Sequence, residues 1–136
     1  MIWTVAHVAP HWTVRNDAHY RALRALSRLA PRLVDALEGD SDRDVTAVTA
    51  EVSAALDLVR ESYHAPACTQ EIPHDEARRL LLVGDAVWRL DLALRAMKPM
   101  GLPRRREPRA TTEARLHWHS RVETELRELR ALRRAA

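Results

Sequence analysis

Phenylalanine is absent from this sequence, and both lysine and cysteine occur only once, as Lys98 and Cys68. A single cysteine excludes a disulfide within these 136 residues and a zinc site made of several cysteines. Three glycines are too few for a glycine-rich phosphate loop, and no nucleophile-elbow motif is found. These absences favour a non-enzymatic protein without a metal or cofactor in a reducing cytoplasm.

Long apolar runs are also absent. Residues 1–8 are mostly apolar, but they have no basic lead and no long uninterrupted apolar run, so we expect neither a signal peptide nor a membrane span. Arginine replaces lysine almost completely, while Ala, Leu and Val are abundant. Because G+C-rich codons produce this bias, we expect a bacterium with such a genome, or its phage, as the source.

What is present is typical of one folded domain. A chain of 136 residues falls in the common size range for a single hydrophobic core. Apolar residues make up 46% and charged residues 30%, with both signs well represented, which argues against disorder. We therefore treat residues 1–136 as a single domain.

Apolar residues recur at helical spacing in four segments, and turn residues separate the segments. The predicted helices cover residues 14–38, 41–64, 73–98 and 111–132. Pro31 lies inside the first, where its ring clashes with the carbonyl four residues back, so we expect a bend or a division there. The apolar faces place Leu26, Val52, Val87 and Leu126 in the core.

Four amphipathic helices without strand-like alternation predict an all-α four-helix bundle, arranged up-down-up-down. Residues 1–12 stay unassigned and are treated as an N-terminal arm. Residues 99–109 combine proline with arginine, so they form a stiff basic connector before the last helix.

Charge is unevenly distributed between the two halves of the chain. Residues 1–76 hold 7 arginines and 12 acids, a net charge of −5, whereas residues 77–136 hold 15 basic residues and 7 acids, a net charge of +8. Such asymmetry permits the C-terminal half to bind an acidic partner or nucleic acid, while in a folded bundle the acidic first half can instead lie against the basic second half. The candidate binding residues form two groups. Those of the connector are Arg104, Arg105, Arg106 and Arg109, and those of an external stripe on the first helix are Arg21, Arg24, Arg28 and Arg32. Asp17 and Asp35 lie in the same stripe, and we expect them to neutralise part of its charge.

Several polar residues fall on the core side of their helices, where a bundle tolerates them only if they are paired. They are His19, Asp91, Arg115 and Glu125. Because consecutive helices run antiparallel, Asp91 should lie level with Arg115 and His119. We predict an ion pair between Asp91 and one of these two residues, with Arg95 competing for the carboxylate.

Three arginine–histidine pairs with three intervening residues resemble the arginine–histidine signature of the HEPN ribonuclease superfamily, which consists of small helical bundles. In that family four to six residues separate the two. The pairs are Arg15/His19, Arg60/His64 and Arg115/His119. The resemblance implies a ribonuclease as the third of the functions considered.

Metal-binding patterns are incomplete. His7 and His11 have helical spacing, but Pro10 lies between them. Glu61 and His64 form one of the two Glu-x-x-His units that a di-iron bundle uses, so we expect no metal site.

The resulting prediction is a small helical interaction or regulatory module that acts by binding itself or another protein. The alternative is a nucleic-acid-binding protein that uses the basic C-terminal half.

Overall fold

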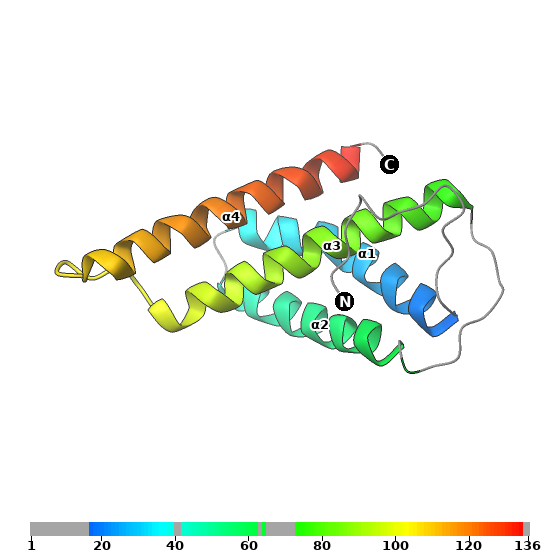
Figure 1. Ribbon diagram of the computed structural model, residues 1–136, viewed down its shortest axis with the longest axis horizontal. Helices are drawn as coiled ribbons and strands as arrows, with labels where there is room; N and C mark the ends of the chain where they lie inside the picture. Colours follow the sequence, from blue (N-terminus) through cyan, green and yellow to red (C-terminus); the bar gives the residue numbers. More distant parts are fainter. Residues whose placement is uncertain (1–16, 40–41, 63, 65–72, 135–136) are drawn as a thin grey trace.

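The computed structural model describes residues 17–39, 42–62, 64 and 73–134. In these residues the chain forms four α-helices and one 3₁₀ turn, with no strand; their bounds are α1 Asp17–Glu38, α2 Asp42–Ser62, α3 His74–Met97, η2 Lys98–Met100 and α4 Arg109–Arg134. Successive helices run in opposite directions (Figure 1). The predicted all-α, up-down-up-down bundle is therefore confirmed.

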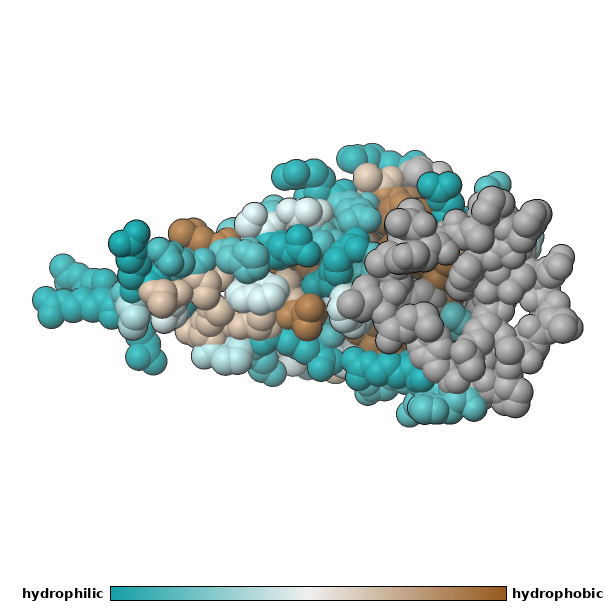
Figure 2. All heavy atoms as spheres, in the orientation of Figure 1, coloured by the Kyte–Doolittle hydropathy of each residue, from teal (hydrophilic) through white to brown (hydrophobic). Residues whose placement is uncertain are grey.

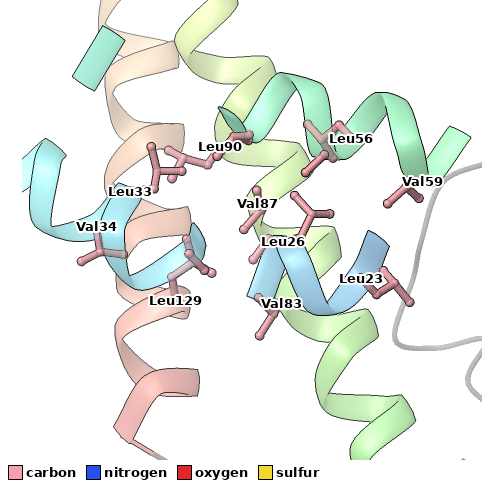
Figure 3. Packing of buried hydrophobic residues seen from close by; sticks show 14 of the residues in the cluster. Leu23, Leu26, Leu33, Val34, Leu56, Val59, Val83, Val87, Leu90 and Leu129 are labelled. Atoms are coloured by element: carbon pink, nitrogen blue, oxygen red, sulfur yellow. The ribbon is translucent and has the colours of Figure 1, made fainter. Parts of the chain in front are cut away.

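The bundle consists of two helical hairpins. α1 packs mainly against α2 and α3 packs mainly against α4, and the hairpins meet chiefly through α1 and α3. Buried leucines and valines from the four helices form one core (Figure 3). Leu26, Val52, Val87 and Leu126 all belong to this core, as predicted.

Local sequence explains where the helices begin and end. Gly39 follows α1, and its N–H donates to the carbonyl of Asp35 at 3.1 Å. α3 begins after Pro73, and its first turn carries Asp75 and Glu76, whose charges suit the positive end of the helix dipole. α4 begins at Arg109, two residues before the earliest predicted start. Each of these ends coincides with a glycine or a proline that stops or starts a helix.

α1 continues through Pro31 as one helix (Figure 1). The predicted division at Pro31 is therefore wrong, and the predicted bend stays a prediction. Leu33, Val34 and Ala36 after the proline are buried in the same core as Leu26 before it. Burial on both sides of Pro31 keeps the helix together despite the lost hydrogen bond.

No helix in the described ranges is long and apolar enough to cross a membrane. The N-terminal arm, Arg15 and Cys68 lie outside the described residues, and so do the histidines His7 and His11.

Candidate functional site

The α3–α4 hairpin projects beyond the other two helices. The connector and the first turns of α4 extend past the end of α1 and the start of α2 (Figure 1). We call residues 92–118, the part of the hairpin around this connector, the hairpin end.

Arg115 holds the connector in place. Its Nη1 donates to the carbonyl of Gly101 at 2.7 Å, and its Nη2 donates to the carbonyl of Met100 at 3.3 Å. The same guanidinium forms an ion pair with Glu107, which also accepts a hydrogen bond from the Thr112 hydroxyl at 2.9 Å. The hydrogen bond from Arg115 keeps the pKa of the Glu107 carboxyl below its ordinary value. These bonds fix the connector against α4, although it contains no regular helix after Met100.

A group of exposed cations surrounds this fixed connector. We call Lys98, Arg104, Arg105, Arg106 and Arg109 the cationic tip, and all five are exposed. Arg109 pairs with Glu113 at 3.0 Å. Arg104, Arg105 and Arg106 form no ion pair or hydrogen bond with any residue in the described ranges. Figure 2 shows this hydrophilic extremity at one end of the molecule.

Apolar side chains are exposed beside the cationic tip. Leu102 is 86% exposed, Leu116 is 64% exposed and Leu92 is 46% exposed. In Figure 2 apolar areas lie over α3 and the first half of α4, next to the hydrophilic extremity. Contiguous apolar surface marks interaction sites more often than single exposed apolar residues do.

A groove separates the first half of α2 from the last half of α3. Its volume is about 630 Å³. Its walls alternate apolar and polar side chains: Val45, Thr46, Thr49, Ala50 and Ser53 from α2, and Asp91, Leu94, Arg95 and Lys98 from α3. Lys98 belongs both to this groove and to the cationic tip, so the two features adjoin.

Asp91 is buried, as predicted, but its predicted partner is wrong. The carboxylate pairs with Arg95 at 2.9 Å, and Arg95 also donates to the Ser53 hydroxyl of α2 at 2.8 Å. Arg115 pairs with Glu107 instead, and His119 is exposed. The helical wheel placed Asp91 on an inward face correctly, but that face of α3 meets α2 and not α4. Burial raises the pKa of the Asp91 carboxyl above its ordinary value, although Arg95 opposes the shift.

The charged link between α3 and α4 is centred on Arg89, which sequence reasoning missed. Its guanidinium pairs with Asp85 one turn earlier, with Glu125 at 3.0 Å and with Glu128 at 2.9 Å. Burial raises the pKa of the Asp85 carboxyl despite the adjacent arginine. Glu125 was predicted on the core side of α4 and is buried. A buried glutamate needs a cationic partner, so its position was the feature of the sequence that could have indicated this cluster. The cluster joins α3 to α4 next to the hairpin end, on the side of the bundle core.

The arginine stripe on α1 is external, as predicted, because Arg21, Arg24, Arg28 and Arg32 are all exposed. The prediction that Asp35 neutralises part of the charge of this stripe through pairs within α1 is wrong. Arg32 pairs with Glu51 of α2 at 2.7 Å, and Asp35 pairs with Arg133 of α4 at 3.1 Å.

The residues considered for catalysis are dispersed. Arg60 pairs with Asp57 at 3.3 Å beside the exposed His64 near the end of α2. Arg115 and His119 lie on α4, where Arg115 is engaged by Glu107 and the connector. Among the residues that the structure describes, no group of three or more His, Cys, Asp or Glu side chains could hold a metal ion.

No family model, no curated protein and no solved structure matches this chain. The functional proposal therefore rests on the surfaces described above.

Proposed function

We propose that this protein is a non-enzymatic assembly module that associates with a second copy of itself through the hairpin end. The observation that supports this is the exposure of Leu102 and Leu116 on a rigidly held projection. Burying one such leucine fully contributes about 1.5–3 kcal/mol, whereas its exposure stabilises nothing in the single chain.

Charge complementarity supports a second copy of the chain as the partner. α2 carries five acids and two arginines, a net charge of −3, whereas residues 98–109 carry five basic residues and one acid, a net charge of +4. The total net charge of the chain is only +3, so repulsion between two copies is weak. The cationic tip of one copy is thus attracted to the α2 surface of another.

The groove between α2 and α3 is the receiving surface in this proposal. None of the five acids of α2 belongs to its wall, whose charged residues are Asp91, Arg95 and Lys98. The wall offers Val45, Ala50 and Leu94 to an incoming leucine. A two-fold dimer lets each copy insert its hairpin end into the groove of the other, so both contacts form at once. This reciprocity distinguishes a closed dimer from an open filament.

The test is the molar mass measured by light scattering over a range of protein concentrations. We expect the mass to rise from that of one chain to that of two, and Leu116→Ser to shift the midpoint at least about tenfold to higher concentration, which corresponds to about 1.4 kcal/mol. Leu58→Ser is the matched control, because Leu58 is 54% exposed on α2 outside the groove and the hairpin end. A constant single-chain mass at high concentration would exclude self-association.

A second candidate function is nucleic-acid binding at the cationic tip. It is supported by Arg104, Arg105 and Arg106, which are exposed and form no ion pair or hydrogen bond within the described residues, although the charge of Arg104 helps to lower the pKa of Glu107. Its affinity should fall steeply with salt, with a slope of about 0.7 to 0.9 per phosphate neutralised. Replacing all three arginines with glutamine should remove most of that slope. A mass of one chain together with such binding would favour this candidate over assembly.

A further inference from the structure

A second cleft lies between the middle of α1 and the beginning of α3. Its volume is about 210 Å³, and its walls are Arg24, Ser27 and Arg28 of α1 and Glu76, Arg79 and Leu80 of α3. One water molecule needs roughly 10–15 Å³ of such space, so this cleft accommodates a group much larger than a single water. It contains no residue of the hairpin end.

One edge of the cleft is fixed by contacts between the two helices. The Tyr20 hydroxyl donates to Glu76 Oε1 at 2.6 Å, and this hydrogen bond raises the pKa of Tyr20 above its ordinary value. The guanidinium carbon of Arg24 lies 5.5 Å from the centre of the Tyr20 ring, which is a cation–π distance. α1 and α3 are thus tied together at this edge, and Arg24 is held beside the cleft.

The remaining cations of the cleft have no such partner. Arg28 and Arg79 come from different helices, are both exposed, and form no ion pair or hydrogen bond with a residue of the described ranges. Three arginines and one glutamate leave the cleft with a net charge of +2. Like charges around a cavity repel each other, so an anion between them would be stabilising.

Arginines elsewhere on α1 and α4 show the contrast. Arg32 pairs with Glu51 across α1 and α2, Arg133 pairs with Asp35, and Arg130 pairs with Glu38 across α1 and α4. In each of these cases an arginine on one helix meets an acid on the next. At the cleft, two arginines on facing helices have an open volume between them instead.

We infer that this cleft is a binding site for a phosphoryl oxyanion, with Arg28 and Arg79 donating hydrogen bonds from opposite walls. The planar guanidinium presents paired N–H donors that match two oxygens of a phosphate group. Arg24 supplies a third positive charge, and the Ser27 hydroxyl supplies a further donor.

The neighbouring surface indicates what else the ligand can carry. A smaller hollow of about 60 Å³ shares Ser27 and Arg79 with the cleft and is otherwise walled mainly by apolar residues such as Val34, Val83 and Leu129. A phosphate ester can therefore place its phosphoryl group between the arginines and a small apolar substituent in the hollow. Free phosphate would contact the arginines and Ser27 and would leave the apolar hollow empty.

The experiment is a titration of the full chain with inorganic phosphate at constant ionic strength, followed by two-dimensional amide NMR. We expect saturable shifts at residues around Arg28 and Arg79, and an affinity lowered at least about tenfold in the double variant Arg28→Gln/Arg79→Gln. Arg78→Gln is the matched control, because Arg78 is also exposed on α3 but is not part of the cleft wall. It should keep the affinity within about twofold of the unmodified chain.

Two further probes separate the sources of the phosphoryl group. Phenyl phosphate should bind more tightly than inorganic phosphate if the apolar hollow is used, and equal affinities would identify free phosphate as the better match. A single-stranded oligonucleotide that binds at these arginines while inorganic phosphate does not would overturn the proposal in favour of a nucleic-acid surface. Shifts that do not saturate, or that respond equally to Arg78→Gln, would also overturn it.

Thermal stability gives a second readout, which does not require a titration of binding affinity. A ligand that binds only the folded state raises the melting temperature by mass action. Phosphate stabilises any folded protein somewhat relative to chloride, so the expected result is a larger rise in melting temperature for the unmodified chain than for the double variant at equal ionic strength. Circular dichroism checks that the double variant is folded, and an equal rise in both proteins would contradict a specific site.

Discussion

At the scale of single residues, Arg89 shows how charge is accommodated inside the bundle. Asp85 and Glu125 have side chains only 2% and 3% exposed, and both pair with this guanidinium, while Glu125 also pairs with Arg121 at 3.9 Å. A buried carboxylate that loses its partner cannot recover the solvation that it gave up on folding. One arginine thus supports two buried acids and joins α3 to α4.

Arg89→Met should lower the free energy of unfolding by about 3–5 kcal/mol at neutral pH, because it leaves Asp85 buried without its cation and Glu125 with only the longer pair to Arg121. Chemical denaturation measures this loss. The matched control is Arg60→Met, which removes an exposed pair with Asp57 and should cost less than about 1 kcal/mol. Equal losses in the two variants would mean that the cluster around Arg89 does not form.

Asp91 should make stability depend on pH in a defined direction. Burial raises its pKa in the folded state, so the folded chain keeps this proton to higher pH than the unfolded chain does. The stabilisation is complete below the unfolded pKa and is lost as pH rises through the folded pKa.

Asp91→Asn has no such titration, so its stability relative to the unmodified chain should improve as pH rises from about 3 to 7. Denaturation of both proteins across that range measures the difference. Asp85 and Glu107 titrate in both proteins, and their contributions cancel in it. A difference that stays constant, or that changes in the opposite direction, would contradict a raised pKa at Asp91.

At the scale of helices, the sequence predicted the number, the order and most ends of the elements. Helical spacing of apolar residues is a property of each segment alone, and glycine and proline mark the ends locally. The division at Pro31 was wrong because the buried residues on both sides of it stabilise one continuous helix, which a local rule for proline does not include.

Pro31→Ala should therefore raise the free energy of unfolding, by roughly 1–3 kcal/mol. It restores an N–H donor to the helix interior, and part of the gain is offset by greater freedom of the unfolded chain. Thermal and chemical denaturation measure the change. A loss of stability would show instead that a bend at Pro31 is needed to pack Leu33 and Val34.

The candidate surfaces were predictable only in part. Exposure of Arg104, Arg105 and Arg106 followed from a connector rich in proline and arginine. Arg95 was predicted only as a competitor for Asp91, and Glu107 was not predicted as the partner of Arg115, because a helical wheel shows which face points inward but not which neighbouring helix that face meets. The phosphoryl cleft likewise depends on Arg28 and Arg79 coming together from two helices, and Arg79 has no distinguishing pattern in the sequence.

At the scale of the whole molecule, the acidic residues of α2 and the basic residues of the connector lie on different parts of the bundle. Acidic α2 lies against the α3 groove, while the cationic tip and the exposed leucines lie on the projecting hairpin end. Leu94, Arg95 and Lys98 of the hairpin end already line the groove, whereas the connector that carries Leu102 is fixed to α4 by Arg115. Two chains can satisfy both surfaces reciprocally.

The most direct test of this arrangement is paramagnetic relaxation enhancement between two copies. A chain carrying Ala110→Cys and Cys68→Ser receives a spin label at the start of α4, next to the cationic tip. It is mixed with an equal amount of ¹⁵N-enriched chain that carries no spin label. We expect broadening of amide signals along the groove, from Val45 to Ser53 on α2 and from Asp91 to Lys98 on α3. No broadening at concentrations where the mass is that of two chains, or broadening confined to other helices, would contradict association through the hairpin end.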